Sequence, residues 1–206
     1  MTISVCMIVK NEEKNLAACL DCLHEIADEI IIVDTGSADK TKEIAAQYTD
    51  KIYDFTWVDD FSAARNFAFS KASMDYIYSA DADERLDKEN QARFLQLKKV
   101  LLPEIEIVQM YYCNQLEHNT IYSYDKEYRP KLYKRVRRFV WQEKVHEAVA
   151  LEPVVYDSDI EIIHKPHDNH GSRDLQIFAK MVENGEVISN RNIKNTINNS
   201  MPMKIT

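Results

Sequence analysis

Residues 76–84 combine a short apolar run with two carboxylates, two residues apart, at its end. The run 76–80 is typical of a buried strand, and a helical pattern begins near Asp87. Asp81 and Asp83 follow the strand, so they lie at the carboxyl edge of a sheet, where open α/β sheets bind ligands. Mg²⁺ prefers such oxygens and keeps positions open for substrate phosphates. The segment predicts a metal-held phosphate, and the alternative is a solvated acidic turn.

Strand-like and helical segments alternate over the first hundred residues. Apolar runs predict strands at 3–9, 29–33, 51–55 and 76–80. Helical patterns follow Asn11, which is a plausible N-cap, begin near Asp39 or Lys40, and cover 61–72 and 88–101. This alternation favours a mostly parallel α/β sheet. After Pro103, the strand-like segments 105–112, 120–123 and 131–136 lack long helices between them, so we expect antiparallel strands to be added there. A last helix is predicted at 172–188.

Composition excludes several classes of protein. The chain has 206 residues, 45% of them hydrophobic, and its net charge of −8 argues against a nucleic-acid binder. No apolar run could span a membrane and no signal-like segment opens the chain, so a cytoplasmic location is expected. Four cysteines form no disulfide framework and are expected to be buried thiols. Three glycines are too few for a dinucleotide fingerprint or a P-loop.

The expected organisation is one domain over 1–188, followed by a flexible tail at 189–206. Within the domain, residues 1–102 and 103–188 are expected to form two halves. Basic residues gather in the second half, and they form either a solvated charged edge or an anion-facing surface. They are Arg129, Lys131, Lys134, Arg135, Arg137, Arg138 and Lys144.

Asp34 ends the second predicted strand in the sequence Asp-Thr-Gly-Ser. An aspartic protease would need a second such carboxylate, and the chain has no second copy of the motif. A strand-to-helix turn is the better interpretation, in which Asp34 accepts hydrogen bonds from a base or a ribose beside Asp81 and Asp83. The alternative is that Asp34 only stabilises its turn, as Asp39 is expected to do.

Four blocks stand in order along the chain: 4–13 (SVCMIVKNEE), 32–41 (IVDTGSADKT), 60–66 (DFSAARN) and 81–84 (DADE). Together they resemble glycosyltransferase family 2, in its SunS-like or repeat-associated branch. The resemblance implies a nucleotide-binding half at 1–102 and an acceptor-side half at 103–188. The resemblance extends over 3–167. It implies a GT-A fold, a three-layer α/β/α sandwich with a mostly parallel central sheet, and an inverting transfer that depends on Mn²⁺ or Mg²⁺.

The resemblance also implies roles for individual residues. Nucleotide-sugar contacts fall on Val9, Asn11, Glu12, Asp34, Arg65, Asn66 and Asp81. Asp83 would ligate the metal, with Asp81 on the ribose or on a metal-bound water. Arg65 could instead be an ordinary surface residue of its helix.

The general base is expected within residues 141–147. Glu147 is the first candidate, and His146 or Glu143 could take the role instead. His146 or His164 could complete the metal sphere. A single histidine on an apolar strand can also be a core residue, which is the alternative for His164.

The predicted function is transfer of a sugar from a UDP-sugar to an acceptor hydroxyl, in surface polysaccharide synthesis or a related process. The acceptor could be a saccharide, a lipid-linked molecule or a peptide, and the protein could lie at the inner membrane face. Nucleotidyl transfer onto a sugar phosphate would need a glycine-rich loop, which residues 10–13 do not provide. The remaining alternative is a degenerate GT-A domain that binds a nucleotide or a partner without turnover.

Overall fold

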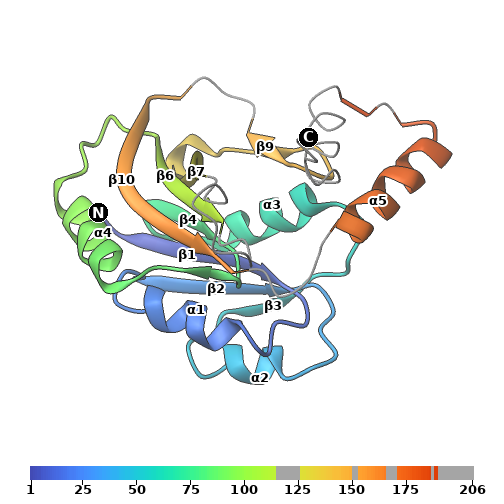
Figure 1. Cartoon of the computed structure of the whole chain (residues 1–206), viewed down its shortest axis with the longest axis horizontal. Coiled ribbons are helices and arrows are strands. Elements are labelled where there is room, and N and C mark those ends of the chain that lie inside the picture. The colour runs from blue at the N-terminus through green and yellow to red at the C-terminus, as the bar shows by residue number, and fades with distance from the viewer. Residues whose placement is uncertain (115–125, 150–152, 166–170, 187, 190–206) are drawn as a thin grey trace, which may run out of the picture.

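A computed structural model describes residues 1–114, 126–149, 153–165, 171–186 and 188–189 (Figure 1). Its main sheet has the strand order β3-β2-β1-β4-β7-β6-β10-β5. The strands are β1 (Ile3–Val9), β2 (Glu29–Asp34), β3 (Ile52–Asp54), β4 (Tyr76–Ala80), β5 (Glu84–Arg85), β6 (Ile107–Asn114), β7 (Lys126–Lys134) and β10 (Val155–His164). The first four are mutually parallel, β7 is antiparallel to β4 and β6, and β10 is parallel to β6.

Helices cover both faces of this sheet. α1 (Leu16–Leu23), α2 (Thr41–Ala45) and α4 (Lys88–Val100) contribute to the apolar cluster on one face. α3 (Phe61–Lys71) and the hairpin of β8 (Trp141–Gln142) and β9 (Ala148–Val149) cover the other, and α5 (Gly171–Glu183) packs on Val145 and Phe61. Figure 1 shows α1 and α2 below the sheet and α3 above it. The predicted three-layer α/β/α architecture is confirmed.

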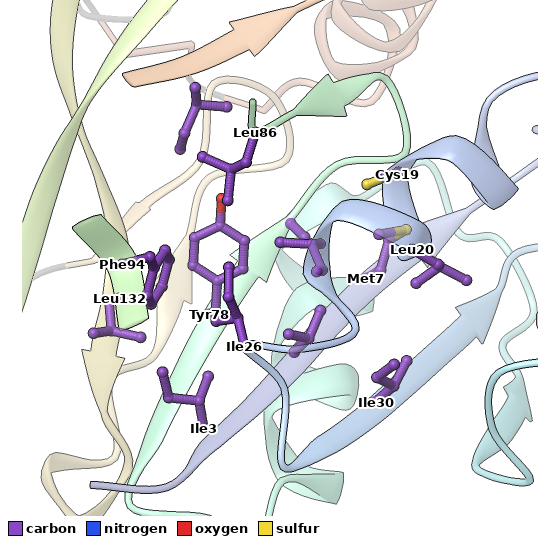
Figure 2. Packing of buried hydrophobic residues seen from close by; sticks show 14 of the residues in the cluster. Ile3, Met7, Cys19, Leu20, Ile26, Ile30, Tyr78, Leu86, Phe94 and Leu132 are labelled. Carbon is purple, nitrogen blue, oxygen red and sulfur yellow. The ribbon is translucent and has the colours of Figure 1, made fainter. Parts of the chain in front are cut away.

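The central strands are buried because apolar side chains point to both faces. Along β1, Val5 and Met7 enter one core cluster while Cys6 enters the other. Figure 2 shows the packing between Tyr78 of β4 and Phe94 of α4, whose rings meet edge to face at 5.4 Å. All four cysteines are free thiols, as predicted, and three of them are buried.

Two turns lie side by side at the carboxyl ends of β1 and β2. The amide of Thr35 donates to the carbonyl of Val9 at 2.9 Å, and the amide of Asn11 donates to Ser37 Oγ at 2.9 Å. The expectation that Asn11 caps α1 is wrong, since Asn11 has a φ of 56° and its side chain accepts from the Ala38 amide. The helix begins at Leu16 because residues 11–15 first form this turn.

Most predicted elements agree with the structure within a few residues. The last helix ends at Glu183 instead of 188, β5, β8 and β9 were not predicted, and β10 was predicted only as an apolar strand around His164. The predicted strand 120–123 and nearly all of the predicted tail lie outside the described residues, and the division at 102/103 stays a prediction. No helix in the described ranges has the length and apolar character needed to cross a membrane.

Candidate active site

A cleft of about 1190 Å³ opens at the carboxyl ends of β1 and β4. The turns after these strands form one wall, and β7, the β8–β9 hairpin and the end of β10 form the other. Lining residues that matter below are Val9, Lys10, Glu12, Thr35, Arg65, Ser79, Asp81, Asp83, Tyr112, Lys131, Trp141, His146, Glu147 and His164. The cleft therefore lies where the carboxylates after β4 were predicted to meet a ligand.

Arg65 connects the two walls of this cleft. Its side chain is only 14% exposed, and its guanidinium donates to Glu147 Oε1 at 2.5 Å, to Ser79 Oγ at 3.0 Å and to Asp81 Oδ1 at 3.0 Å. The guanidinium also lies 5.2 Å from the centre of the Trp141 ring. Arg65 is therefore a buried cation that fixes Asp81 relative to Glu147.

Asp81 is held as a carboxylate by two cations. Burial acts to raise the pKa of Asp81, but the charges of Arg65 and of Lys131, 3.8 Å away, hold that pKa well below its usual range. The side chain is 35% exposed, so one edge faces the cleft. An ionised carboxylate at this position can accept hydrogen bonds from a ligand such as a ribose.

Asp83 lies beside His164, a residue 81 positions later in the chain. His164 Nε2 is 3.0 Å from Asp83 Oδ2, and the amide of Lys165 donates to the Asp83 carbonyl at 2.9 Å. The antiparallel pairing of β5 with β10 places Glu84 opposite His164 and so fixes this geometry. One carboxylate oxygen and one imidazole nitrogen on a cleft wall fit a divalent cation such as Mn²⁺.

Asp81 pairs with Arg65 and Lys131, and its predicted place among the metal ligands stays a prediction. Among the described residues, no group of three or more His, Cys, Asp or Glu side chains could hold a metal ion. Of the described side chains, Asp83 and His164 would hold a cation here, and a substrate and water could fill further positions. Such a partly open coordination sphere is common where Mg²⁺ or Mn²⁺ binds a phosphate.

Asp34 is buried at the end of β2, with 2% of its surface exposed. Its Oδ1 accepts from the amides of Gly36 and Ser37, each at 3.0 Å, which stabilises a turn in which Gly36 adopts a φ of 101°. Its Oδ2 is buried without a hydrogen-bond partner in the described part of the chain. A buried carboxylate oxygen without a hydrogen-bond donor has lost its hydration without compensation. A donor from a ligand that reached Asp34 Oδ2 would offset that free-energy cost.

The other predicted nucleotide contacts differ in their surroundings. Val9 and Glu12 line the cleft, whereas Asn11 uses its side chain for the neighbouring turn. Asn66 bonds both backbone groups of Trp141: its Nδ2 donates to the carbonyl at 3.0 Å, and its Oδ1 accepts from the amide at 2.8 Å. The structure thus gives Asn66 a role in holding the β8–β9 hairpin, and its predicted nucleotide contact stays a prediction.

The three candidates for the base have distinct positions. Glu147 and His146 line the cleft, and His146 has a φ of 53°. Glu143 has a φ of 72°, and its Oε2 is buried without a partner among the described residues. Glu147 is the candidate that a second charged group fixes in place, because it receives the Arg65 hydrogen bond.

Sequence reasoning missed a buried ion pair behind Asp81. Lys131 Nζ donates to Glu84 Oε1 at 2.7 Å, and Glu84 Oε2 accepts from the Asp81 amide at 3.3 Å. Both side chains are less than a tenth exposed. Lys131 was grouped with the basic cluster, and only the alternation of β7, which turns Lys131 inward, could have separated it from the exposed cations.

The Glu84 carboxyl predicts a pH dependence of stability. Burial raises the pKa of Glu84 to about 7, opposed by Lys131 and reinforced by Asp81, from an ordinary value of 4.5. Because the folded pKa is higher than the unfolded one, this contribution is fully present below pH 4.5 and is lost as the pH rises through 7. The free energy of unfolding of the wild type is therefore expected to fall between pH 4.5 and pH 7. We expect Glu84→Gln to make this fall smaller by about 1–3 kcal/mol. Urea unfolding of the metal-free protein at the two pH values measures the difference.

The matched control is Glu25→Gln, which changes an exposed carboxyl after α1 and is expected to keep the wild-type pH slope. Identical slopes for the wild type and Glu84→Gln would contradict the assignment of this titration to Glu84.

Comparison with known proteins finds a matching family, related sequences and solved structures of similar fold. The family model for Glycosyl transferase family 2 matches residues 4–152. The glycosyltransferase SunS of Bacillus subtilis is 32% identical over 165 residues, which cover 77% of this chain and 36% of SunS. A TPR repeat-containing protein of Synechococcus elongatus is 46% identical over 84 residues, 41% of this chain and 21% of that protein. The chain thus spans only about a fifth to a third of the length of these curated relatives.

Solved structures share the fold. Glucosyl-3-phosphoglycerate synthase from Mycobacterium tuberculosis, crystallised with Mn²⁺ and UDP-glucose, aligns with a TM-score of 0.58 at 15% identity, covering 91% of this chain and 80% of the synthase. TarS of S. aureus aligns with a TM-score of 0.56 at 14% identity, covering 98% of this chain and 44% of TarS. The three-layer α/β/α sandwich described above is therefore a GT-A fold, as predicted.

Proposed function

We propose that this chain, which belongs to glycosyl transferase family 2, moves a sugar from a UDP-sugar to an acceptor hydroxyl with inversion at the anomeric carbon. The observation that carries the proposal is that one cleft holds both a candidate metal-binding pair and a candidate base that an arginine holds in place. Asp83 and His164 offer ligands for a divalent cation, while Arg65 fixes Asp81 and Glu147 in their positions. The UDP and Mn²⁺ in the synthase crystal are consistent with this use of the fold.

Donor binding is assigned to the wall formed by the turns after β1, β2 and β4. Asp34 would use its unpartnered oxygen to accept from the uracil or ribose, and Val9 and Glu12 would lie along the nucleoside. Asp81, held as a carboxylate, would accept from a ribose hydroxyl. A Mn²⁺ or Mg²⁺ ion bound by Asp83 and His164 would offset the charge that grows on the leaving diphosphate.

Transfer then needs a base on the opposite face of the sugar. The acceptor oxygen forms its bond to the anomeric carbon as the bond from that carbon to the diphosphate oxygen breaks, and Glu147 takes the hydroxyl proton. Arg65 keeps the Glu147 carboxylate oriented by donating from Nε, so the oxygen without that bond is available to the acceptor. UDP leaves with the bonding electrons.

Titration of UDP into the protein tests the proposal directly. With Mn²⁺ present we expect binding, and with EDTA we expect the affinity to fall by about tenfold or more, because a cation held by Asp83 and His164 would offset the charge of the diphosphate. Isothermal titration calorimetry measures both conditions on one sample.

No binding under either condition would reject a nucleotide site and leave Asp81 and Asp83 as a structural turn. Metal-dependent binding of UDP with no release of UDP from any UDP-sugar, with or without acceptors, would favour the degenerate binding module. The Arg65 ion pair gives that alternative some support, since it already occupies one oxygen of the candidate base.

A further inference from the structure

The chain leaves β7 through a short basic segment, residues 134–140, which we call the basic ridge. Its sequence is KRVRRFV, so four of its seven residues are cations in a protein whose net charge is −8. A 3-10 turn at Arg135–Arg137 and a left-handed Arg138, with a φ of 49°, present the ridge at the surface. The ridge lies at the amino end of β4, because Lys134 pairs with Tyr76, whereas the cleft lies at the carboxyl end.

Two of the four ridge cations have a carboxylate nearby. Arg137 pairs with Glu106 at 2.7 Å, and the charge of Arg135 interacts with the Asp75 carboxylate. Lys134 Nζ donates to the backbone carbonyl of Pro103, which carries no net charge. Arg138 is exposed and has no ion-pair partner among the described residues. A field from about two uncompensated cations therefore faces the solvent here.

Apolar side chains stand between these cations. Val136 is 65% exposed and Val140 is 57% exposed. A hollow of about 600 Å³ lies beside them, with Arg135 and Arg138 among its lining residues and Phe69 and Phe139 among its aromatic ones. Cations beside exposed valines and an aromatic-lined hollow match a ligand that is anionic on one side and apolar on the other.

We propose that the basic ridge docks this protein onto a bilayer that contains anionic phospholipid. Lipid phosphates would pair with the ridge cations, and Val136 and Val140 would lie below the headgroups, at the boundary with the acyl chains. Because the chain outside the ridge has a net negative charge, an anionic surface would favour orientations in which the ridge faces it. A soluble polyanion would use the cations but would leave the valines exposed to water, so the valines favour the bilayer.

Vesicle co-sedimentation tests this assignment. The wild type is expected to bind vesicles of phosphatidylcholine and phosphatidylglycerol in a three-to-one mixture, to bind phosphatidylcholine alone weakly, and to be released by high salt. Arg137→Gln with Arg138→Gln is expected to lower the partition coefficient about tenfold, since each cation near an anionic surface contributes about a fivefold factor and Arg137 is already paired. Val136→Ser with Val140→Ser is expected to lower it as well, while leaving the charge unchanged.

The matched control is Lys88→Gln with Lys99→Gln, which removes the same charge from exposed positions on α4, on the opposite face of the sheet. It is expected to bind like the wild type. Equal binding to both kinds of vesicle, or an equal loss in the α4 control, would overturn the proposal. If the valine variant binds vesicles as the wild type does, and the protein binds heparin equally well, the ridge is a site for a soluble polyanion. UDP titration of the same variants keeps this result separate from the nucleotide site, because none of the changed side chains lines the cleft.

Discussion

Replacing Asp83 with alanine is expected to abolish the metal-dependent part of UDP binding while the protein stays folded. The change removes the carboxylate oxygen that lies 3.0 Å from His164 Nε2, and the imidazole alone binds a hard cation poorly. Changes to outer-shell partners of a metal already cost about tenfold to a hundredfold in affinity, so loss of a direct ligand is expected to cost at least that. Titration of UDP in Mn²⁺, repeated in EDTA, measures the effect.

Two further variants make the result specific. His164→Ala is expected to cause a loss of the same kind, and the double variant is expected to be little worse than either single one, because both remove the same ion. Asp59→Ala is the matched control: Asp59 also lines the cleft, but its carboxylate pairs with Lys180 and lies outside the proposed metal site. A protein with Asp83→Ala that still binds UDP more tightly in Mn²⁺ than in EDTA would refute the metal assignment.

The fold was predictable wherever local patterns agree with tertiary structure. The strands 3–9 and 76–80 match β1 and β4 at both ends, because continuous apolar runs bounded by polar turns leave little ambiguity. The helix after β1 was placed too early, since Asn11 looks like a cap but is used to join two turns. The short strands β5, β8 and β9 were missed because two residues carry no periodicity, and only their partners define them.

The site was predictable to the level of single residues on one side only. Asp81 and Asp83 follow a strand, so their position at the sheet edge could be read from local sequence. Arg65 and His164 were predicted as site residues, but their contacts could not be read from local sequence, because Arg65 approaches Asp81 from a helix and His164 approaches Asp83 from a strand 81 residues later. The part that Asn66 plays in holding the β8–β9 hairpin was also not predictable from local sequence, and its nucleotide contact stays a prediction.

Glu147→Gln is expected to reduce sugar transfer by about a hundredfold to ten-thousandfold and to leave UDP affinity unchanged. Glutamine keeps an oxygen that can accept from Arg65 Nε, so the link between the cleft walls persists, yet the amide cannot take the acceptor proton. Release of UDP from UDP-sugars, with and without candidate acceptors, measures the loss. Arg65 would still be paired with Asp81 at 3.0 Å, so the variant is expected to fold.

The matched controls are the other two candidate bases. Glu143→Gln and His146→Gln are each expected to retain far more transfer than Glu147→Gln, because the ion pair with Arg65 holds the Glu147 carboxylate in the cleft. Wild-type turnover in Glu147→Gln together with loss of turnover in His146→Gln would identify His146 as the base instead. Alanine at 147 is a poorer test, because it leaves one hydrogen bond of the buried Arg65 guanidinium unmade and so mixes a change of stability with a change of chemistry.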